Sequence, residues 1–184
     1  GPNGAGKSTF MKLMTGQLKP SQGTIRVLGE PIWGNPPVYD RIGFCPEQDA
    51  FYERMTGLEW VTALVRLNGL SDTDADAAAK RAIERVDLTS AMDKKIGAYS
   101  KGMRQRIKLA QSLVHDPELL ILDEPTDGLD PLGRSQVRGL LVQLKSQGKT
   151  VFLNSHILQE VELICDRVAI LDQGRLRGVG KAEE

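Results

Sequence analysis

Apolar residues recur at helical spacing in five segments of this chain. Near the N-terminus the pattern begins at Phe10 and extends to Leu18, which predicts a helix that runs to about residue 18. Ser100 stands where the N-cap of a later helix is expected, and Ser71 or Asp72 stands at the start of another. The predicted helices cover residues 9–18, 56–67, 72–86, 101–114 and 132–146.

Shorter apolar runs predict strands between these helices. Two of them, 119–122 and 150–153, are continuously apolar, which is typical of strands buried on both faces of a parallel sheet. The helix between them completes a βαβ unit. Gln173 and Gly174 separate the last two runs and favour a hairpin turn. The predicted strands cover residues 24–28, 41–45, 119–122, 150–153, 167–171 and 175–179.

Together these elements predict an α/β fold. We expect a mainly parallel sheet flanked by helices, with antiparallel β-hairpins and a mainly helical subdomain inserted over about residues 51–98. At 184 residues the chain is expected to form one domain, residues 1–184.

The composition narrows the classes of partner. Lys plus Arg and Asp plus Glu both number 24, so the net charge of zero gives no support to nucleic-acid binding, and nucleic acid is not expected as a partner. Cys45 and Cys165 lie far apart and outside any metal-binding spacing, so both are expected to be small buried side chains in a reducing compartment. No apolar run approaches the roughly 18 residues that cross a bilayer.

The first nine residues fit the phosphate-binding pattern G-x-x-x-x-G-K-[ST]. In such a loop, successive backbone N–H groups turn toward a polyphosphate at the start of a helix, where the helix dipole favours an anion. Lys7 would reach the β- and γ-phosphates, and the Ser8 hydroxyl would ligate Mg²⁺. We therefore expect the phosphate-loop NTPase version of the α/β fold. The predicted nucleotide-binding residues of the loop are Gly1, Pro2, Asn3, Gly4, Ala5, Gly6, Lys7, Ser8 and Thr9.

A phosphate loop follows a buried strand, and no strand precedes Gly1 in this sequence. We therefore expect the chain to be an N-terminally truncated piece of a longer protein. Taken alone, the loop has a second interpretation, a glycine-rich turn ahead of an ordinary amphipathic helix. Other residues must decide between the two.

Acidic residues and a histidine follow the two continuously apolar runs. Asp123 and Glu124 come directly after the first run, and His156 follows the second. Open α/β sheets place their ligand groups at the carboxyl ends of strands. Asp123 is therefore predicted to hold Mg²⁺, through water, across from Ser8, and Glu124 is predicted to face an attacking water. Alone, the acidic pair would be a solvated turn and the histidine structural, but their convergence on a phosphate loop favours catalysis.

These motifs, and the order in which they follow one another along the chain, resemble the nucleotide-binding subunit of ATP-binding cassette (ABC) transporters. The resemblance extends over the whole chain. The match covers the Walker A loop at 1–9, the Walker B strand with its catalytic carboxylate at 119–124, the D-loop at 128–131 and the switch histidine at His156. The segment 99–103, Tyr-Ser-Lys-Gly-Met, looks like the signature sequence that separates ABC proteins from other phosphate-loop enzymes.

Two segments depart from the family pattern. The usual signature is Leu-Ser-Gly-Gly-Gln, of which this chain keeps Ser100 and Gly102, and the variant resembles exporters of the drug, antibiotic or polysaccharide kind. The family places the Q-loop glutamine directly after a proline. Here Glu47 follows Pro46 and Gln48 comes next, so either Glu47 or Gln48 would contact the Mg²⁺-bound water.

The resemblance implies ATP and Mg²⁺ as cofactors and a head-to-tail pair with a second ATP-binding subunit, identical or different. Ser100 and Gly102 of one copy would cover ATP on the loop of the other, and Asp130 of the D-loop would join the nucleotide contacts.

Within each site of the pair, the resemblance also assigns the chemistry. Glu124 would polarise water, His156 would hold the γ-phosphate, and Lys7 would neutralise developing charge.

The resemblance further implies a transmembrane permease domain or subunit that ATP hydrolysis powers for export. The expected location is cytoplasmic, peripheral on the inner face of the cell membrane. Residues 51–59 would meet the membrane partner, although packing within the core explains their apolar side chains equally well. The alternatives are a soluble ABC ATPase that acts on ribosomes or DNA, and a degenerate cassette that only binds nucleotide.

Overall fold

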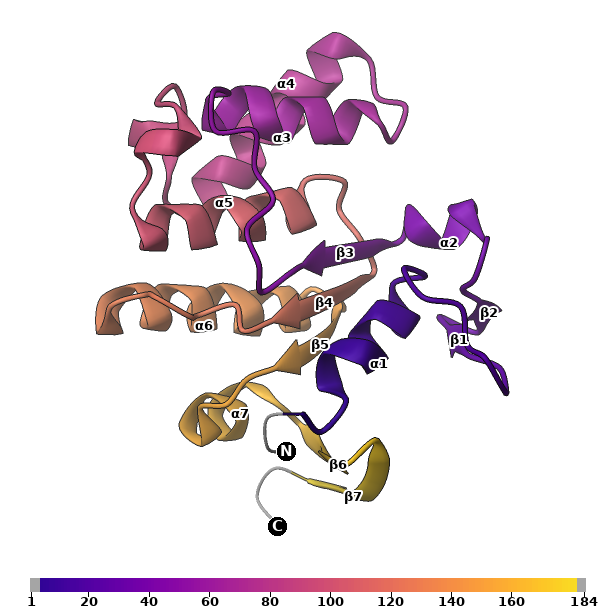
Figure 1. Ribbon diagram of the computed structural model, residues 1–184. Coiled ribbons are helices and arrows are strands. Elements are labelled where there is room, and N and C mark those ends of the chain that lie inside the picture. Colours follow the sequence, from indigo (N-terminus) through magenta and orange to yellow (C-terminus); the bar gives the residue numbers. More distant parts are fainter. Residues whose placement is uncertain (1–3, 182–184) are drawn as a thin grey trace.

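The computed structural model describes residues 4–181, and a three-stranded parallel sheet lies at its centre (Figure 1). Phe44, Ile121 and Phe152 stand opposite one another across the three strands. Because the strands are parallel, their carboxyl ends meet at one edge of the sheet. The strands, in sheet order, are β3 (Ile42–Cys45), β4 (Leu119–Asp123) and β5 (Thr150–Asn154).

The central strand β4 is buried at every position, and its side chains alternate between two cores. Leu120 and Leu122 belong to the larger core, which the helices on one side of the sheet complete. Leu119 and Ile121 pack with Met11 in a smaller core on the other side. The apolar run thus fills both faces of the sheet, as its sequence predicts.

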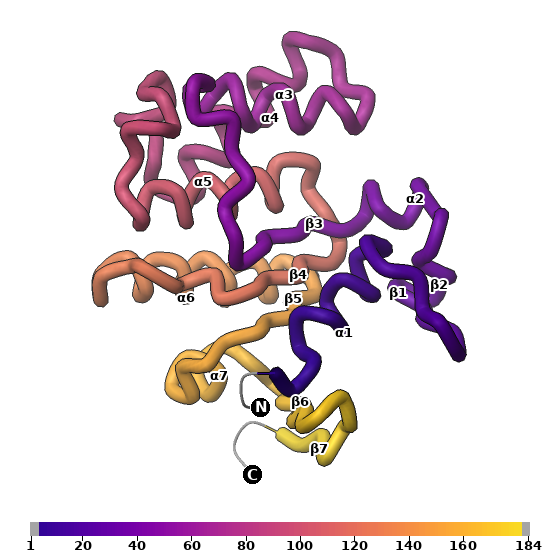
Figure 2. The backbone as a smooth tube through the Cα atoms, in the orientation of Figure 1, coloured from indigo at the N-terminus to yellow at the C-terminus, as the bar shows by residue number. Residues whose placement is uncertain are grey.

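Helices cover both faces of the sheet and form a further layer at one end (Figures 1 and 2). Helix α1 contacts β4, α6 contacts β5, and α5 packs between β3 and the pair α3 and α4. Within the described residues, no helix is both long and apolar enough to cross a membrane. The α-helices are α1 (Lys7–Met14), α2 (Pro36–Tyr39), α3 (Gly57–Arg66), α4 (Asp72–Arg85), α5 (Lys101–Leu113), α6 (Pro131–Ser146) and α7 (Leu158–Ile164), and the 3₁₀ turns are η1 (Thr89–Ala91) and η2 (Ile96–Ala98).

Capping side chains start the helices of this further layer where the sequence predicts them. At α3, the Thr56 side chain accepts a hydrogen bond from the Glu59 N–H, while the Glu59 carboxylate accepts one from the Thr56 N–H. Ser71 caps α4 and Ser100 caps α5 in the same local manner. A cap of this kind stabilises a helix by about 1 kcal/mol, so these starts are set largely by neighbouring residues.

The C-terminal hairpin has the turn that the sequence predicts. Strands β6 (Arg167–Asp172) and β7 (Arg175–Lys181) pair antiparallel, and Gln173 and Gly174 join them with φ values of 48° and 74°. Positive φ at both positions is what a two-residue hairpin turn requires. The Gly174 N–H donates to the carbonyl of Ala5 at 2.9 Å, so the turn rests against the loop that precedes α1.

Helix α1 is shorter than predicted. It ends at Met14, whereas the spacing of apolar residues predicts a helix to about residue 18. Gly16 has a φ of 71°, and a Cβ at this position would lie 2.6 Å from the ring of Tyr39. The left-handed glycine and the close aromatic ring therefore end the helix one turn early.

The strand predicted over residues 24–28 is also shorter. Only β1 (Arg26–Val27) forms, and it pairs with β2 (Glu30–Pro31). Leu28 and Gly29 have φ values of 54° and 81°, so the chain reverses within two residues of the start of the strand.

The prediction that 150–153 is buried on both faces is wrong. Strand β5 is only half-buried over most of its length, and Thr150 is exposed. Within the described residues β5 is an edge of the three-stranded sheet, since it pairs with β4 alone. An apolar run does not reveal whether a strand has one neighbour or two.

The two cysteines differ in burial. Cys45 in β3 is fully buried, and burial raises the pKa of its thiol to about 12. Cys165 is only partly buried, which also raises its pKa. Thiols with raised pKa values are poor nucleophiles, so neither is a candidate reactive group.

Candidate functional site

A hollow of about 560 Å³ opens at the carboxyl edge of the sheet. We call it the first hollow. It brings the loop before α1 together with residues that follow β3, β4 and β5, as expected from the ends of parallel strands. The residues that line it are Gly4, Ala5, Gly6, Lys7, Ser8, Thr9, Glu47, Glu124, Asp127, Asn154 and His156.

The loop at the start of α1 has the backbone of an anion site. Gly4 and Gly6 adopt φ values of 79° and 94°, which a residue with a Cβ rarely does. Gly6 is the N-cap of α1 and offers no side chain to the first amides of the helix. A helix start of this kind, with its N–H groups and the positive end of the helix dipole, is typical of sites that bind phosphate oxygens. The predicted binding residues Gly1, Pro2 and Asn3 lie outside the described residues.

The C-terminal hairpin supports this loop from outside the hollow. Besides the hydrogen bond from Gly174 to Ala5, a Cβ built on Gly6 would lie 3.3 Å from the Cα of Gly174. The two glycines therefore permit a close backbone contact. The phosphate loop and the hairpin, separated by almost the whole chain, hold each other in place.

Glu124 and His156 form a pair inside the first hollow. The Nδ1 atom of His156 lies 2.8 Å from Oε2 of Glu124, and the His156 N–H donates to the same oxygen at 3.4 Å. Burial raises the pKa of Glu124, whose side chain is 12% exposed, while the charge and hydrogen bonds of His156 oppose this rise and the charge of Asp123 adds to it. The raised pKa of this carboxylate and its fixed orientation are both features of a general base.

Glu124 also occupies an unusual backbone position. Its φ is 49°, and its N–H donates to the carbonyl of Asn154 at 2.9 Å. Strained backbone in a non-glycine residue is concentrated at functional sites in proteins.

Asp123 does not line the first hollow. It is buried at the end of β4, where its Oδ1 accepts a hydrogen bond of 2.6 Å from the side-chain amide of Asn154. Asn154 itself lines the hollow and stands opposite Asp123 in the sheet register. The Asn154 amide therefore links the buried Asp123 carboxylate to a residue that lines the first hollow.

The donor set fits a cation that arrives with a phosphate group. Among residues 4–181, no three or more His, Cys, Asp or Glu side chains gather as a ready-made metal site. Ser8 and Glu47 line the first hollow, whereas Gln48 does not. Mg²⁺ keeps several waters and uses only one or two protein ligands when phosphate oxygens complete its shell. A hydroxyl and a nearby carboxylate at the mouth of a phosphate loop suit that mode of binding.

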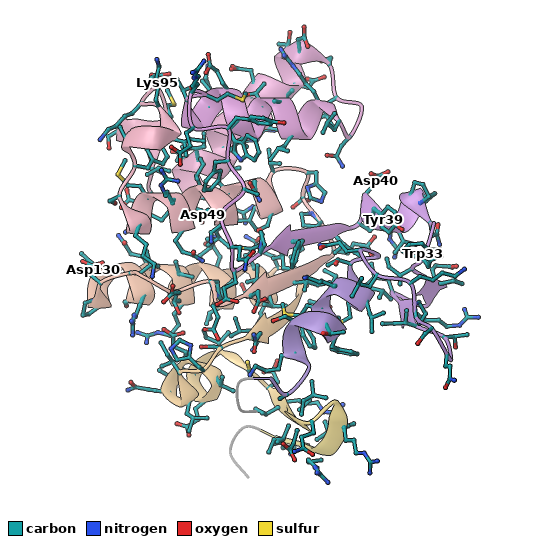
Figure 3. All side chains as sticks on the ribbon, viewed as in Figure 1. Trp33, Tyr39, Asp40, Asp49, Lys95 and Asp130 are labelled. Atoms are coloured by element: carbon teal, nitrogen blue, oxygen red, sulfur yellow. The ribbon has the colours of Figure 1, made fainter. Side chains whose placement is uncertain are left out.

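The other predicted nucleotide contacts lie elsewhere. Ser100, Gly102 and Asp130 line a second hollow of about 520 Å³, which involves the N-terminal ends of α5 and α6. Figure 3 shows Asp130 at the end of α6. The Ser100 Oγ accepts a hydrogen bond from the Met103 N–H, and the Asp130 carboxylate accepts one from the Gly133 N–H. The structure therefore divides the predicted binding residues between two surfaces of the chain.

One ion pair connects the two hollows. Lys101, which lines the second hollow, lies with its Nζ 2.8 Å from a carboxylate oxygen of Asp127, which lines the first. The hydrogen bond from Lys101 lowers the pKa of Asp127. Both side chains are well exposed, so the pair is a surface contact.

Sequence patterns missed two residues of the first hollow and a buried carboxylate beside it. Asn154 is the last residue of β5, and the same strand-end argument that selects Asp123 also selects this position. No sequence pattern considered above selects Asp127. Glu160 of α7 is buried, and it accepts hydrogen bonds from the Thr126 hydroxyl at 2.6 Å and the Ser155 hydroxyl at 3.4 Å. It therefore connects the segments that carry Glu124 and His156.

Comparison with known proteins agrees with this geometry. A family model described as ABC transporter matches residues 1–127. An uncharacterized ABC transporter ATP-binding protein of Nostoc sp. is 46% identical over 189 residues, which cover 100% of this chain and 55% of that protein. The linearmycin resistance ATP-binding protein LnrL of Bacillus subtilis is 39% identical over 98% of this chain and 58% of its own length. The chain thus spans about half the length of these curated relatives.

A solved structure has the same fold. The protein cbiO1 of Clostridium perfringens, described as part of the ABC transporter complex cbiONQ, superposes with a TM-score of 0.83 at 31% identity. The match covers 100% of this chain and 75% of that protein. The α/β fold with its parallel sheet and flanking helices is therefore that of an ABC-type ATP-binding domain.

Proposed function

Because this chain belongs to the ABC transporter family, we propose that it binds and hydrolyses ATP to power transport across a membrane. One observation carries the proposal: the phosphate loop, Glu124 and His156 share the first hollow, while Ser100 and Gly102 line the second. An enzyme needs its phosphate site, base and polarising groups within reach of one another, and the first hollow meets that requirement.

In the first hollow, the amides of residues 4–9 and the ammonium of Lys7 would hold the β- and γ-phosphates. Mg²⁺, when bound with the nucleotide, would neutralise charge on the phosphate oxygens, with the Ser8 hydroxyl in its shell. Glu124 would take a proton from the attacking water, and His156 would orient the Glu124 carboxylate and face the γ-phosphate. The raised pKa of Glu124 brings its basicity closer to what a base needs near neutral pH.

We further propose that two ATP-binding subunits complete each site. Ser100, Gly102 and Asp130 line the second hollow, and none of them lines the first hollow of the same chain. A head-to-tail arrangement would place the second hollow of one copy over the first hollow of the other. The N-terminus of α5 would then face the γ-phosphate, where its dipole favours negative charge.

The remaining assignments of the proposal concern the membrane. We propose a permease domain or subunit as the partner, a cytoplasmic position on the inner membrane face, and export as the direction of transport. The resistance function in the name of LnrL and the Tyr-Ser-Lys-Gly-Met signature both favour export. We also propose that residues 1–184 form one domain in which 51–98 is a helical subdomain.

The test compares ATP binding and ATP-dependent phosphate release in the protein that carries this sequence. We expect both activities, and we expect Lys7→Ala to abolish phosphate release and weaken ATP binding. Lys12→Ala is the matched control, since Lys12 is exposed on the same helix and outside the first hollow. The absence of ATP binding, or equal loss in the two variants, would contradict the proposed function.

A further inference from the structure

Helix α5 carries a buried lysine that the proposed chemistry does not use. Lys108 is only 3% exposed, although its side chain ends in a polar amine. Its Nζ donates to the backbone carbonyl of Glu47 at 2.7 Å and pairs with a carboxylate oxygen of Asp49 at 3.0 Å. Figure 3 shows Asp49 next to α5, in the segment that leaves β3.

A second cation of the same helix holds the same segment. Arg104, one turn before Lys108, lies 3.0 Å from a carboxylate oxygen of Glu53 and 3.8 Å from one of Asp49. Residues 46–55 have neither helix nor strand structure, so their backbone is not fixed by a ladder of their own hydrogen bonds. Side chains of α5 hold the first part of this segment, whereas backbone hydrogen bonds from Ile96 and Gly97 hold its end at Met55 and Glu53.

Burying an ammonium group is expensive unless it is paired and hydrogen-bonded. Lys108 has both kinds of partner, the backbone carbonyl of Glu47 and the carboxylate of Asp49, which lie close together in the sequence. The acceptor belongs to Glu47, whose side chain lines the first hollow. A buried donor with two fixed partners defines where the Cα of Glu47 sits, and hence where its carboxylate can reach.

We propose that Lys108 is a positioning residue for Glu47: it fixes the backbone of residues 47–49 so that the Glu47 carboxylate reaches the Mg²⁺ of bound nucleotide. The proposal rests on the proposed function, because it assumes that nucleotide and Mg²⁺ occupy the first hollow.

Helix α5 also contacts the backbone of Glu124, the proposed base. The side-chain amide of Gln105 donates to the backbone carbonyl of Glu124 at 3.1 Å. Helix α5 therefore contacts the backbone of two residues of the first hollow, while its N-cap Ser100 lines the second.

The experiment is a Mg²⁺ titration of the binding of a fluorescent ATP analogue to the whole protein. In Lys108→Met, the side chain keeps its approximate volume but loses the charge and the donors. We expect the free Mg²⁺ concentration at half-maximal binding to rise about tenfold, the lower end of the effect of removing a group that orients a metal ligand. Binding without Mg²⁺ is expected to change less than twofold. The matched control is Lys80→Met, an exposed lysine on α4 that is paired with Asp76 and expected to leave the titration unchanged.

A double-mutant cycle distinguishes positioning from general structural support. Glu47→Ala alone should raise the Mg²⁺ requirement about as much as Lys108→Met, and the double variant should resemble Glu47→Ala alone. Additive effects, or equal weakening with and without Mg²⁺, would overturn the proposal. So would an unchanged titration in Lys108→Met.

A further variant keeps the test decisive if Lys108→Met does not fold, which thermal denaturation would reveal. Asp49→Asn preserves the shape of the partly exposed partner and should raise the Mg²⁺ requirement about threefold, a smaller effect because the carbonyl of Glu47 still holds Lys108. No change in this variant would also overturn the proposal. A wild-type protein that binds no ATP contradicts the proposed function itself, which is a separate outcome.

Discussion

The two hollows of this chain are built in opposite ways. The first hollow gathers residues from four separate segments, and its central pair, Glu124 and His156, joins the ends of two strands. In the second hollow, Ser100 and Asp130 are the N-caps of α5 and α6, and each is held by a backbone N–H three residues further along the chain. One site depends on the fold as a whole and the other on local capping.

The difference teaches how the two sites should respond to mutation. A side chain in the first hollow is positioned by the loop and the ends of the strands, and none of these side chains is a helix cap. In the second hollow, the Ser100 and Asp130 side chains already cap helices. Their removal therefore weakens the helix as well as any contact with a partner. Variants that leave the caps intact are therefore the sharper probes of the second hollow.

The largest effect is expected from Glu124→Gln in the first hollow. Loss of a general base typically lowers turnover by about 10² to 10⁴-fold. Glutamine keeps the shape, so ATP binding should persist and the paired state should accumulate. Steady-state phosphate release and size-exclusion chromatography with ATP would measure the two effects, with Glu162→Gln on α7 as the exposed control. Turnover within tenfold of the wild type would remove Glu124 from the role of base.

A smaller effect is expected from Gly102→Ala in the second hollow. A Cβ at Gly102 would lie 3.4 Å from Leu129, an ordinary contact, so the chain should fold and bind ATP normally. The added methyl group faces the hollow in which a partner's nucleotide would lie, and a misplacement of about 1 Å can cost up to about a hundredfold in rate. We expect turnover to fall at least tenfold at unchanged ATP affinity.

The control for this variant is Gly139→Ala on α6, where a Cβ meets open space. Alanine within a helix is more stable than glycine by about 0.5 to 1 kcal/mol, so this variant should melt slightly higher and turn over normally. If Gly102→Ala is as active as Gly139→Ala, the second hollow does not cover a nucleotide.

The pH dependence of turnover should also separate the hollows. Because burial raises the pKa of Glu124, the acid limb of the pH–rate profile should lie above the ordinary pKa of glutamic acid. His156 opposes the rise, so His156→Gln should move the acid limb to still higher pH in addition to slowing turnover. Gly102→Ala should lower the whole profile without moving it. A His156→Gln profile that is unmoved or displaced to lower pH would contradict the pairing.

The same raised pKa has a consequence for stability. The folded carboxyl keeps its proton to higher pH than the unfolded one, so ionised Glu124 destabilises the fold above its unfolded pKa, and this penalty disappears as the pH falls. Glu124→Gln should therefore melt higher than the wild type at neutral pH, with the difference vanishing in acid. Thermal denaturation at several pH values would measure it.

The smallest effect is expected from the ion pair between the hollows. Lys101 lowers the pKa of Asp127, so the pair stabilises the fold above the unfolded pKa of that carboxyl, and this contribution is lost as the pH falls through its lowered folded value. Since both side chains are exposed, Lys101→Met should cost about 0.5 kcal/mol or less and nothing measurable in about 1 M salt. Urea unfolding would measure the change. A loss above about 1 kcal/mol that persists in salt would mean that the pair organises the two hollows.

Sequence patterns anticipate the local features of this molecule better than the long-range ones. Ser71 and Ser100 cap helices where predicted, because a cap is defined by residues three positions apart. The run 119–122 is buried on both sides as predicted. Its counterpart 150–153 is not, since burial there depends on the number of neighbouring strands, which apolar spacing does not encode.

The same division holds at the site. The phosphate-loop motif and the positions of strand ends predict that Lys7, Glu124 and His156 converge, and all three line the first hollow. Neither pattern predicts that the Asn154 side chain donates a hydrogen bond to Asp123, or that Lys108 lies 2.7 Å from the carbonyl of a residue 61 positions earlier. These contacts follow from side-chain packing between distant segments, for which the sequence offers no period or spacing.

The contact between Gly174 and Ala5 has a practical consequence for engineering. Hairpin tips with small polar residues are usually the preferred places to insert a tag, a fluorescent reporter or a new terminus. In this protein the hairpin tip is part of the wall that shapes the phosphate loop, because its backbone N–H holds the loop carbonyl directly. A peptide inserted between Gln173 and Gly174 would therefore weaken nucleotide binding from a point remote in the sequence. An insertion at Gly69, between α3 and α4, would leave the phosphate loop unchanged, because this glycine is exposed and a Cβ built on it would meet open space.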